Sequence, residues 1–180
     1  MSCILGNGVA LGCKDSLGGV KEVYIASYTN LETYTYEEDA ADANYGSITA
    51  IANSGTFYRF EMRQEQGEFI QTGVHNPQNG TNYWEQNASL VFTKNEAVDR
   101  NTLLVLAQST LLVIVLDQNG FYWIVGEKNG AELIESSQSA GKAYSDLNGS
   151  TLTIQGKEAT PSRKIDAAVI PTLPGLVPVP

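Results

Sequence analysis

The sequence predicts a mainly β fold, an antiparallel sandwich or barrel-like structure, with one flanking α-helix near residues 96–108. Segments that alternate apolar and polar residues recur along residues 20–160, as expected for half-buried antiparallel strands. Asn-Gly and Asp-x-Asn-Gly turn sequences separate several of these segments. The 180 residues, 42% of them hydrophobic, fit one globular domain that can bury its own core.

The first half of the chain contains six segments with strand character. In order, they are Val20–Ala26, Leu31–Tyr36, Ser47–Ala52, Phe57–Arg63, Glu68–Val74 and Tyr83–Thr93. The alternation is clearest in Phe57–Arg63. We expect this segment to pair with Glu68–Val74 across the Gln66-Gly67 turn, and we expect His75–Asn82 to form a polar loop.

The predicted helix begins after Asn95, a suitable N-cap, and carries acidic residues in its first turn, where they favour the helix dipole. Its expected apolar stripe consists of Val98, Leu103, Val105 and Leu106. The continuous apolar run Leu111–Leu116 then predicts a buried strand. It forms a hairpin with Phe121–Val125. Two more strands are expected, a short one at Leu133-Ile134 and one at Thr151–Gln155.

Both ends of the chain differ in composition from the domain at residues 20–160. Residues 1–19 are rich in glycine and indicate an N-terminal arm. Residues 161–180 hold five of the six prolines and indicate an extended C-terminal arm, which is apolar enough to sit on its own domain or dock on a neighbour. Cys3 and Cys13 are interpreted as free thiols, although a pair between them stays open. No apolar run is long enough to span a bilayer, so no membrane partner is expected.

The charge is strongly acidic, with 20 Asp and Glu against 11 Lys and Arg and a net charge of −9. A protein that grips nucleic acid through its phosphates needs a basic face, so this class is excluded. The acidic residues are densest in a stretch without basic residues: Glu32, Glu37, Glu38, Asp39 and Asp42. This stretch is either a solvated loop or an acidic face turned towards a pore or a partner.

The sequence offers little for catalysis. His75 is the only histidine and has no cysteine or acidic pair at ligand spacing, so it is interpreted as a surface loop residue. The chain has no phosphate-binding loop, nucleophile elbow or calcium-loop pattern. We therefore expect neither an enzyme nor a bound cofactor or metal.

Two sequence motifs follow the long strand at 83–93 and the helix near 96–108 in a characteristic order. They are DQNGFYWIVGEKNG (117–130) and DLNGSTLTIQGKE (146–158). Over about residues 14–162, the chain resembles tail-tube and neck-ring structural proteins of tailed bacteriophages with Bacteroides-type hosts, including the crAss-like group. The resemblance implies a tail-tube-like β fold that assembles with itself into stacked rings of six or twelve copies. No functional residue is carried over, because such proteins have no active site.

The resemblance also implies a place and partners. The protein would be assembled in the host cytoplasm and reside in the virion, next to other tail or neck proteins, and DNA would pass transiently without specific binding. The acidic stretch at 32–42 would then face the channel and repel DNA. Tail tube, neck ring and tail terminator remain open. The alternative class is a capsid decoration or adhesin-like β-sandwich module that binds through the loops near residues 76–84.

Overall fold

The computed structural model of the chain describes residues 15–37, 46–94, 98 and 100–175. Cys3, Cys13, Glu38, Asp39 and Asp42 therefore lie outside the described residues. The same is true of Asn95 and of the acidic residues expected in the first turn of the helix. The predictions that rest on these residues stay predictions.

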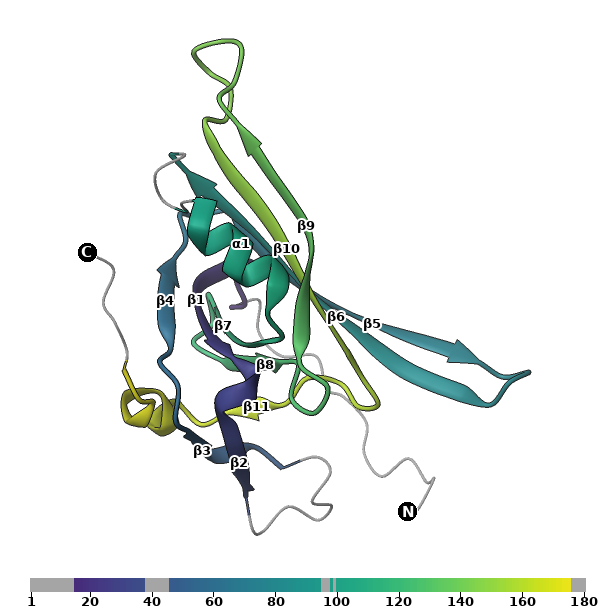
Figure 1. Cartoon of the computed structure of the whole chain (residues 1–180). Coiled ribbons are helices and arrows are strands. Elements are labelled where there is room, and N and C mark those ends of the chain that lie inside the picture. The colour runs from purple at the N-terminus through teal and green to yellow at the C-terminus, as the bar shows by residue number, and fades with distance from the viewer. Residues whose placement is uncertain (1–14, 38–45, 95–97, 99, 176–180) are drawn as a thin grey trace.

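The described chain is mainly β, as predicted, with one α-helix among the described residues (Figure 1). In the first half, the strands are β1 (Val20–Ser27), β2 (Leu31–Tyr36), β3 (Ile48–Asn53), β4 (Tyr58–Glu61), β5 (Gly67–Asn76) and β6 (Thr81–Thr93). In the second half, α1 (Arg100–Gln108) precedes β7 (Leu111–Asp117), β8 (Tyr122–Val125), β9 (Ala131–Ser139), β10 (Gly149–Glu158) and β11 (Lys164–Ile165). Two short 3-10 helices, η1 (Tyr28–Asn30) and η2 (Ala167–Thr172), complete the described elements.

All eleven strands belong to one strongly bent sheet with the order β2-β3-β11-β8-β7-β9-β10-β6-β5, and β1 joins β7 to β4 beside this path. The central strand β7 is buried on both faces. Its residues Val113 and Val115 enter a first apolar cluster with β6 and β10, whereas Leu112 and Ile114 enter a second cluster with β3 and η2. The sheet therefore bends around two cores, which is a sandwich-like arrangement.

Two long hairpins project from this body, β5–β6 and β9–β10, and they lean in different directions (Figure 1). The β5–β6 hairpin corrects the predicted strand pairing. Glu68–Val74 pairs with β6 instead of β4, and β4 pairs with β1, with Phe60 opposite Val23. The chain is redirected between β4 and β5 at Glu65, whose φ of 61° is left-handed.

Residues 75–82 do not form a loop. Strand β5 continues through His75 to Asn76, and β6 begins at Thr81. The turn between them is tight because the Asn76 side chain accepts hydrogen bonds from the backbone N–H groups of Gln78 and Asn79, at 3.1 and 3.3 Å. Strand β9 is likewise much longer than the two residues predicted. It is rich in serine and glutamine, and these give no alternation of hydropathy.

Helix α1 occupies the predicted place, within a narrower described range. Leu106 is buried and Leu103 packs against the first apolar cluster, together with the buried Val98. Val105 was expected in the same stripe but is 61% exposed. It lies next to Leu106 in sequence, about 100° around the helix, so it points away from the core.

The described part of the C-terminal segment lies on its own domain. Strand β11 inserts between β3 and β8, which are not otherwise paired with each other. Ile165, Val169, Ile170 and Leu173 are buried in the second apolar cluster. Residues 161–175 are thus part of the packed body instead of the extended arm that their prolines suggested.

Candidate functional site

Strands β9, β10, β6 and β5 form a regular four-strand sheet in which every neighbouring pair is antiparallel. Side chains on one face are buried against the body, among them Ala88, Leu90, Leu152 and Ile154. The opposite face, called the polar face below, follows from the register. Glu68 lies opposite Ser89, Ser89 opposite Thr153, and Thr153 opposite Glu135.

The polar face carries threonine, serine, asparagine and glutamine side chains, together with Ile70, Val74, Tyr83 and Val91. Within the four strands, its charged side chains are Glu68, Glu85, Glu132, Glu135 and Lys157. Lys157 pairs with Glu85 at 3.4 Å, which leaves three carboxylates without an ion pair among the described residues. A face of short uncharged polar groups with an excess of negative charge repels polyanions and offers no built site for a small ligand.

Both outer strands of this sheet have an open edge. Within the described chain, β5 pairs only with β6. Strand β9 meets β7 at a single position, Ala131 opposite Leu111, and beyond that point it pairs only with β10 among the described residues. An unpaired strand presents a row of backbone N–H and C=O groups that can bind another strand.

The direction of the two edges is informative. Because four strands alternate in direction, β5 and β9 run opposite to each other. If a second copy is placed beside the first by simple rotation, β5 of one copy and β9 of the next form an antiparallel pair. The alternation then continues without a break, and the polar faces of both copies lie on the same side.

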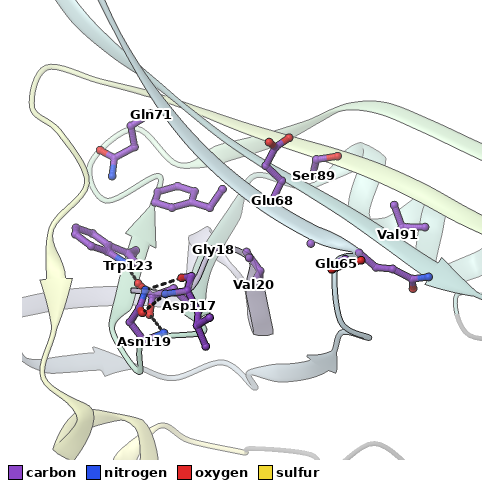
Figure 2. A pocket seen from close by; sticks show the side chains of 15 residues that line it. Gly18, Val20, Glu65, Glu68, Gln71, Ser89, Val91, Asp117, Asn119 and Trp123 are labelled. Atoms are coloured by element: carbon purple, nitrogen blue, oxygen red, sulfur yellow. Dashed lines mark hydrogen bonds between the residues drawn. The ribbon is translucent and has the colours of Figure 1, made fainter. Parts of the chain in front are cut away.

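A groove with a volume of about 770 Å³ runs along β5, and it is called the β5 groove below (Figure 2). Phe69 and Trp123 supply an aromatic wall, with ring centroids 6.4 Å apart. Glu65 and Glu68 stand at the rim. The Asp117 carboxylate is already engaged, since it accepts hydrogen bonds from the Trp123 indole N–H at 3.0 Å and from the backbone N–H groups of Asn119 and Phe121.

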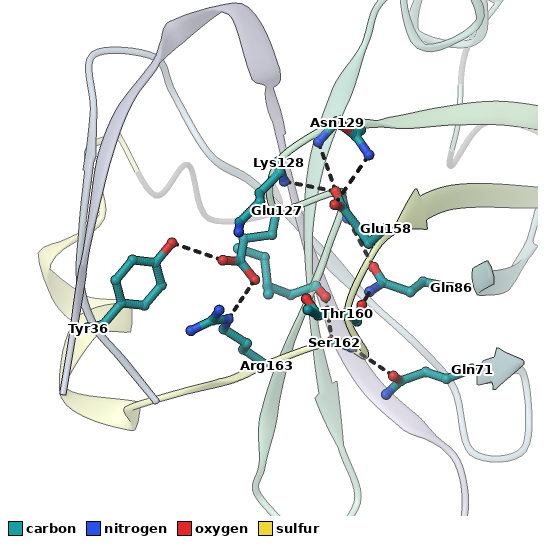
Figure 3. A network of polar contacts seen from close by, with 12 residues as sticks. Tyr36, Gln71, Gln86, Glu127, Lys128, Asn129, Glu158, Thr160, Ser162 and Arg163 are labelled. Carbon is teal, nitrogen blue, oxygen red and sulfur yellow. Dashed lines mark hydrogen bonds and ion pairs between the residues drawn. The ribbon is translucent and has the colours of Figure 1, made fainter. Parts of the chain in front are cut away.

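A buried polar network joins the turn between β8 and β9 to the C-terminal segment (Figure 3). Arg163 Nε lies 3.1 Å from Glu127 Oε2, and both side chains are at most 5% exposed. The Tyr36 hydroxyl donates to Glu127 Oε1 at 2.9 Å, while the Arg163 guanidinium lies 4.6 Å from the centroid of the Tyr36 ring. Burial, and then the hydrogen bond to Glu127, raise the pKa of Tyr36 to about 12.

A second carboxylate fixes the same turn. Glu158 Oε1 accepts hydrogen bonds from the backbone N–H groups of Lys128 and Asn129, both at 2.8 Å. Burial raises the pKa of Glu158, although these two hydrogen bonds oppose the shift. Both carboxylates in this network have structural partners. We therefore interpret the network as structural: it attaches the C-terminal segment to the turn between β8 and β9.

The structure describes two of the sequence-predicted acidic residues, and both lie away from the polar face. Glu32 is exposed on β2, and Glu37 follows that strand directly. Strand β2 is at the opposite end of the strand order from β5, so the fold does not bring these two carboxylates onto the polar face. His75, expected in a loop, lies on β5, where its Nδ1 is 2.7 Å from the Asn82 side-chain oxygen and its ring packs edge-on to Trp84.

Sequence reasoning missed the polar face because its strands were predicted too short or paired differently. The signal was the regular spacing of threonine, serine and glutamate in residues 81–93 and 149–158. Among the described residues, no cluster of histidine, cysteine or acidic side chains is suited to a metal ion, and no helix is long and apolar enough to cross a membrane. Neither the protein-family models nor the curated proteins give a match to this chain.

Proposed function

We propose that this protein is a structural subunit that assembles with copies of itself into a ring, and that stacked rings form a tube through which a nucleic acid passes. The observation that carries the proposal is the four-strand sheet with two open edges of opposite direction. Closing a ring pairs these edges and removes the unpaired strands that a single copy exposes. The resemblance to phage tail-tube and neck-ring proteins supports a place in a virion.

In such a ring, the four-strand sheets join into one continuous barrel with the polar faces on the inside. The first apolar cluster and α1 lie against the opposite face of the sheet, so the body is on the outside. The channel wall is then lined by hydroxyl and amide groups and by Glu68, Glu132 and Glu135. Phosphates are repelled weakly along the whole wall, and a nucleic acid slides instead of adsorbing.

The backbone pattern of β5 provides a direct test. The Val91 N–H donates to the Gln66 carbonyl oxygen, so the residues of β5 whose N–H groups point to β6 have even numbers. The N–H of Gly73 therefore points away from β6, towards the open edge. A proline at this position leaves the hairpin ladder intact and removes one donor from the edge.

We expect Gly73→Pro to remain folded and monomeric under conditions in which the unaltered chain forms rings, whereas the control Gly73→Ala, which keeps the N–H, still assembles. Sedimentation velocity measures the oligomer, and electron microscopy shows its shape. A chain that stays monomeric at high concentration contradicts the proposal and favours the alternative, a binding module. Assembly of Gly73→Pro equal to that of Gly73→Ala contradicts the role of the β5 edge.

A further inference from the structure

We propose that the joint between copies has a second contact, in which helix α1 of one copy docks into the β5 groove of the next. This inference rests on the ring assembly proposed above and names the surfaces that decide its strength. Its partner is a second copy of this chain. The argument uses the position of the helix, the exposed apolar residues on both sides and the distribution of charge.

The helix of one copy and the groove of the next lie on the same face of the joined sheet. Helix α1 packs chiefly against β9, the outermost strand at its end of the four-strand sheet. The Gln138 side chain of β9 donates to the Val98 carbonyl oxygen at 3.4 Å, on the face that is buried against the body. The lining of the β5 groove includes Phe69 and Gln71, which belong to the same face of β5, as well as Glu68 and Ser89 of the polar face. When β9 of one copy pairs with β5 of the next, the helix and the groove approach each other.

Both surfaces expose apolar side chains that their own chain does not cover. On α1, Leu104 is 47% and Val105 61% exposed. At the groove, Leu17 is 67% exposed and belongs to the lining, together with Phe69 and Trp123. Isolated exposed apolar residues are common, but two apolar surfaces brought together by one joint bury area from water on both sides.

The charges of the two surfaces are complementary. Arg100 is the only basic residue of α1 and is exposed in its first turn. Glu65 stands at the rim of the groove, in the left-handed conformation noted above. Neither side chain forms an ion pair within the described residues. Exposed charges of opposite sign on the two edges favour head-to-tail contact of like copies and disfavour contact between identical edges.

A charge exchange tests the contact. We expect Arg100→Glu and Glu65→Arg each to raise the dissociation constant of the assembly roughly tenfold, and the double variant to recover most of the loss, because the pair is restored with reversed sign. Lys142→Glu makes the same charge change in the exposed loop between β9 and β10, and we expect it to leave ring closure unchanged. Sedimentation velocity at low salt measures the assembly of the four variants and of the unaltered chain.

A crosslink supplies a second, independent readout. In a chain whose Cys3 and Cys13 are replaced by serine, Val105→Cys together with Leu17→Cys is expected to give an oxidation-dependent ladder of oligomers on a denaturing gel. Either cysteine alone gives no product larger than a dimer. Absence of the ladder, together with no recovery in the double charge variant, overturns the helix contact.

The two proposals fail in distinguishable ways. If rings form and Gly73→Pro abolishes them, while the charge exchange and the crosslink have no effect, edge pairing holds and the helix contact is wrong. If the unaltered chain does not assemble at all, both proposals are wrong.

Discussion

Glu127 and Arg163 form an ion pair that is almost completely withdrawn from water. The attraction between two such charges is largely offset by the loss of their hydration, so the pair adds little net stability. The ion pair contributes instead by positioning the C-terminal segment. Arg163 directly precedes β11, and Glu127 lies in the turn after β8, so the two charges allow the C-terminal segment to sit in only one register on the body.

Removal of one partner therefore costs more than removal of both. We expect Glu127→Leu to lower the free energy of unfolding by about 3–5 kcal/mol, because the buried Arg163 guanidinium then loses the Glu127 carboxylate. The double variant Glu127→Leu with Arg163→Met is expected to regain a large part of that loss. Urea unfolding, at a concentration at which the chain is monomeric, measures both. A double variant as unstable as the single one contradicts this account.

Glu158 gives a pH-dependent prediction. Its pKa is raised above the value of 4.5 for an unperturbed glutamate, so the folded state binds its proton more tightly than the unfolded state does. The contribution of this group is fully present below pH 4.5 and is lost as the pH rises through the folded pKa. Glu158→Gln retains an oxygen acceptor for the two turn amides and does not titrate.

We therefore expect the free energy of unfolding of Glu158→Gln, relative to that of the unaltered chain, to increase as the pH rises from 4.5 and to level off above the folded pKa. Chemical unfolding at a series of pH values measures the difference. Glu158→Ala is the contrast. It leaves two partly buried backbone donors without their acceptor and is expected to be destabilised by about 1–3 kcal/mol. A difference between Glu158→Gln and the unaltered chain that does not change with pH argues against the raised pKa.

At the scale of elements, sequence patterns located most strands but not their partners. The apolar run Leu111–Leu116 and its return at Phe121–Val125 form the predicted hairpin, because a turn of fixed length determines that pairing locally. The pairing of β4 with β1 joins residues far apart in sequence, which alternation alone does not specify. The β5–β6 hairpin is local, but it was not predicted because His75–Asn82 was interpreted as a loop. Strand β9 was predicted as two residues only, because residues 136–139 are all serine or glutamine and give no alternation of hydropathy.

The C-terminal segment shows the same limit. Its prolines indicated an extended arm, yet Pro171 lies inside η2, where a fixed φ suits a short 3-10 helix. What holds the segment is the burial of Ile165 and of the apolar residues of η2 in a cluster whose other members include residues of β1, β3, β7 and β8. Such a contact depends on the tertiary fold and cannot be read from the local composition.

We expect Ile165→Ala to lower the free energy of unfolding by about 2–5 kcal/mol, because a buried isoleucine leaves a cavity between β3 and β8. The variant should also lower the local stability of the strands that β11 joins. Since β11 links β3 to β8, amide hydrogen exchange in β2 and β3 is expected to accelerate more than exchange in β6 and β10. Equal acceleration throughout the sheet, measured by mass spectrometry, would show that β11 is not the local link.

At the scale of the whole molecule, two groups among the acidic side chains behind the net charge of −9 are candidates for the channel wall. The sequence drew attention to the stretch at 32–42, of which Glu32 and Glu37 are described on and after β2. The fold gathers another group on the polar face, spread over strands that are far apart in the sequence. Only one of these sets can line the channel of the ring proposed here.

A matched pair of variants decides between them. Glu132→Lys with Glu135→Lys and Glu32→Lys with Glu37→Lys change the net charge by the same amount at two exposed places. If the polar face lines the channel, we expect rings of the first variant to retain DNA that the unaltered rings release, with a retention that weakens steeply as salt is added. Rings of the second variant should then bind DNA no better than the unaltered rings inside the channel, because their new charges lie on β2, in the body.

Electron microscopy of the rings with short duplex DNA, combined with fluorescence anisotropy across a salt series, separates DNA in the channel from DNA on the outside. Channel density with the β2 variant and none with the β9 variant would assign the wall to the acidic stretch at 32–42. It would also require a different orientation of the subunit in the ring. Retention by the β9 variant alone would mean that the register of β9, β10, β6 and β5 sets how a nucleic acid passes, because it places separate glutamates on one wall.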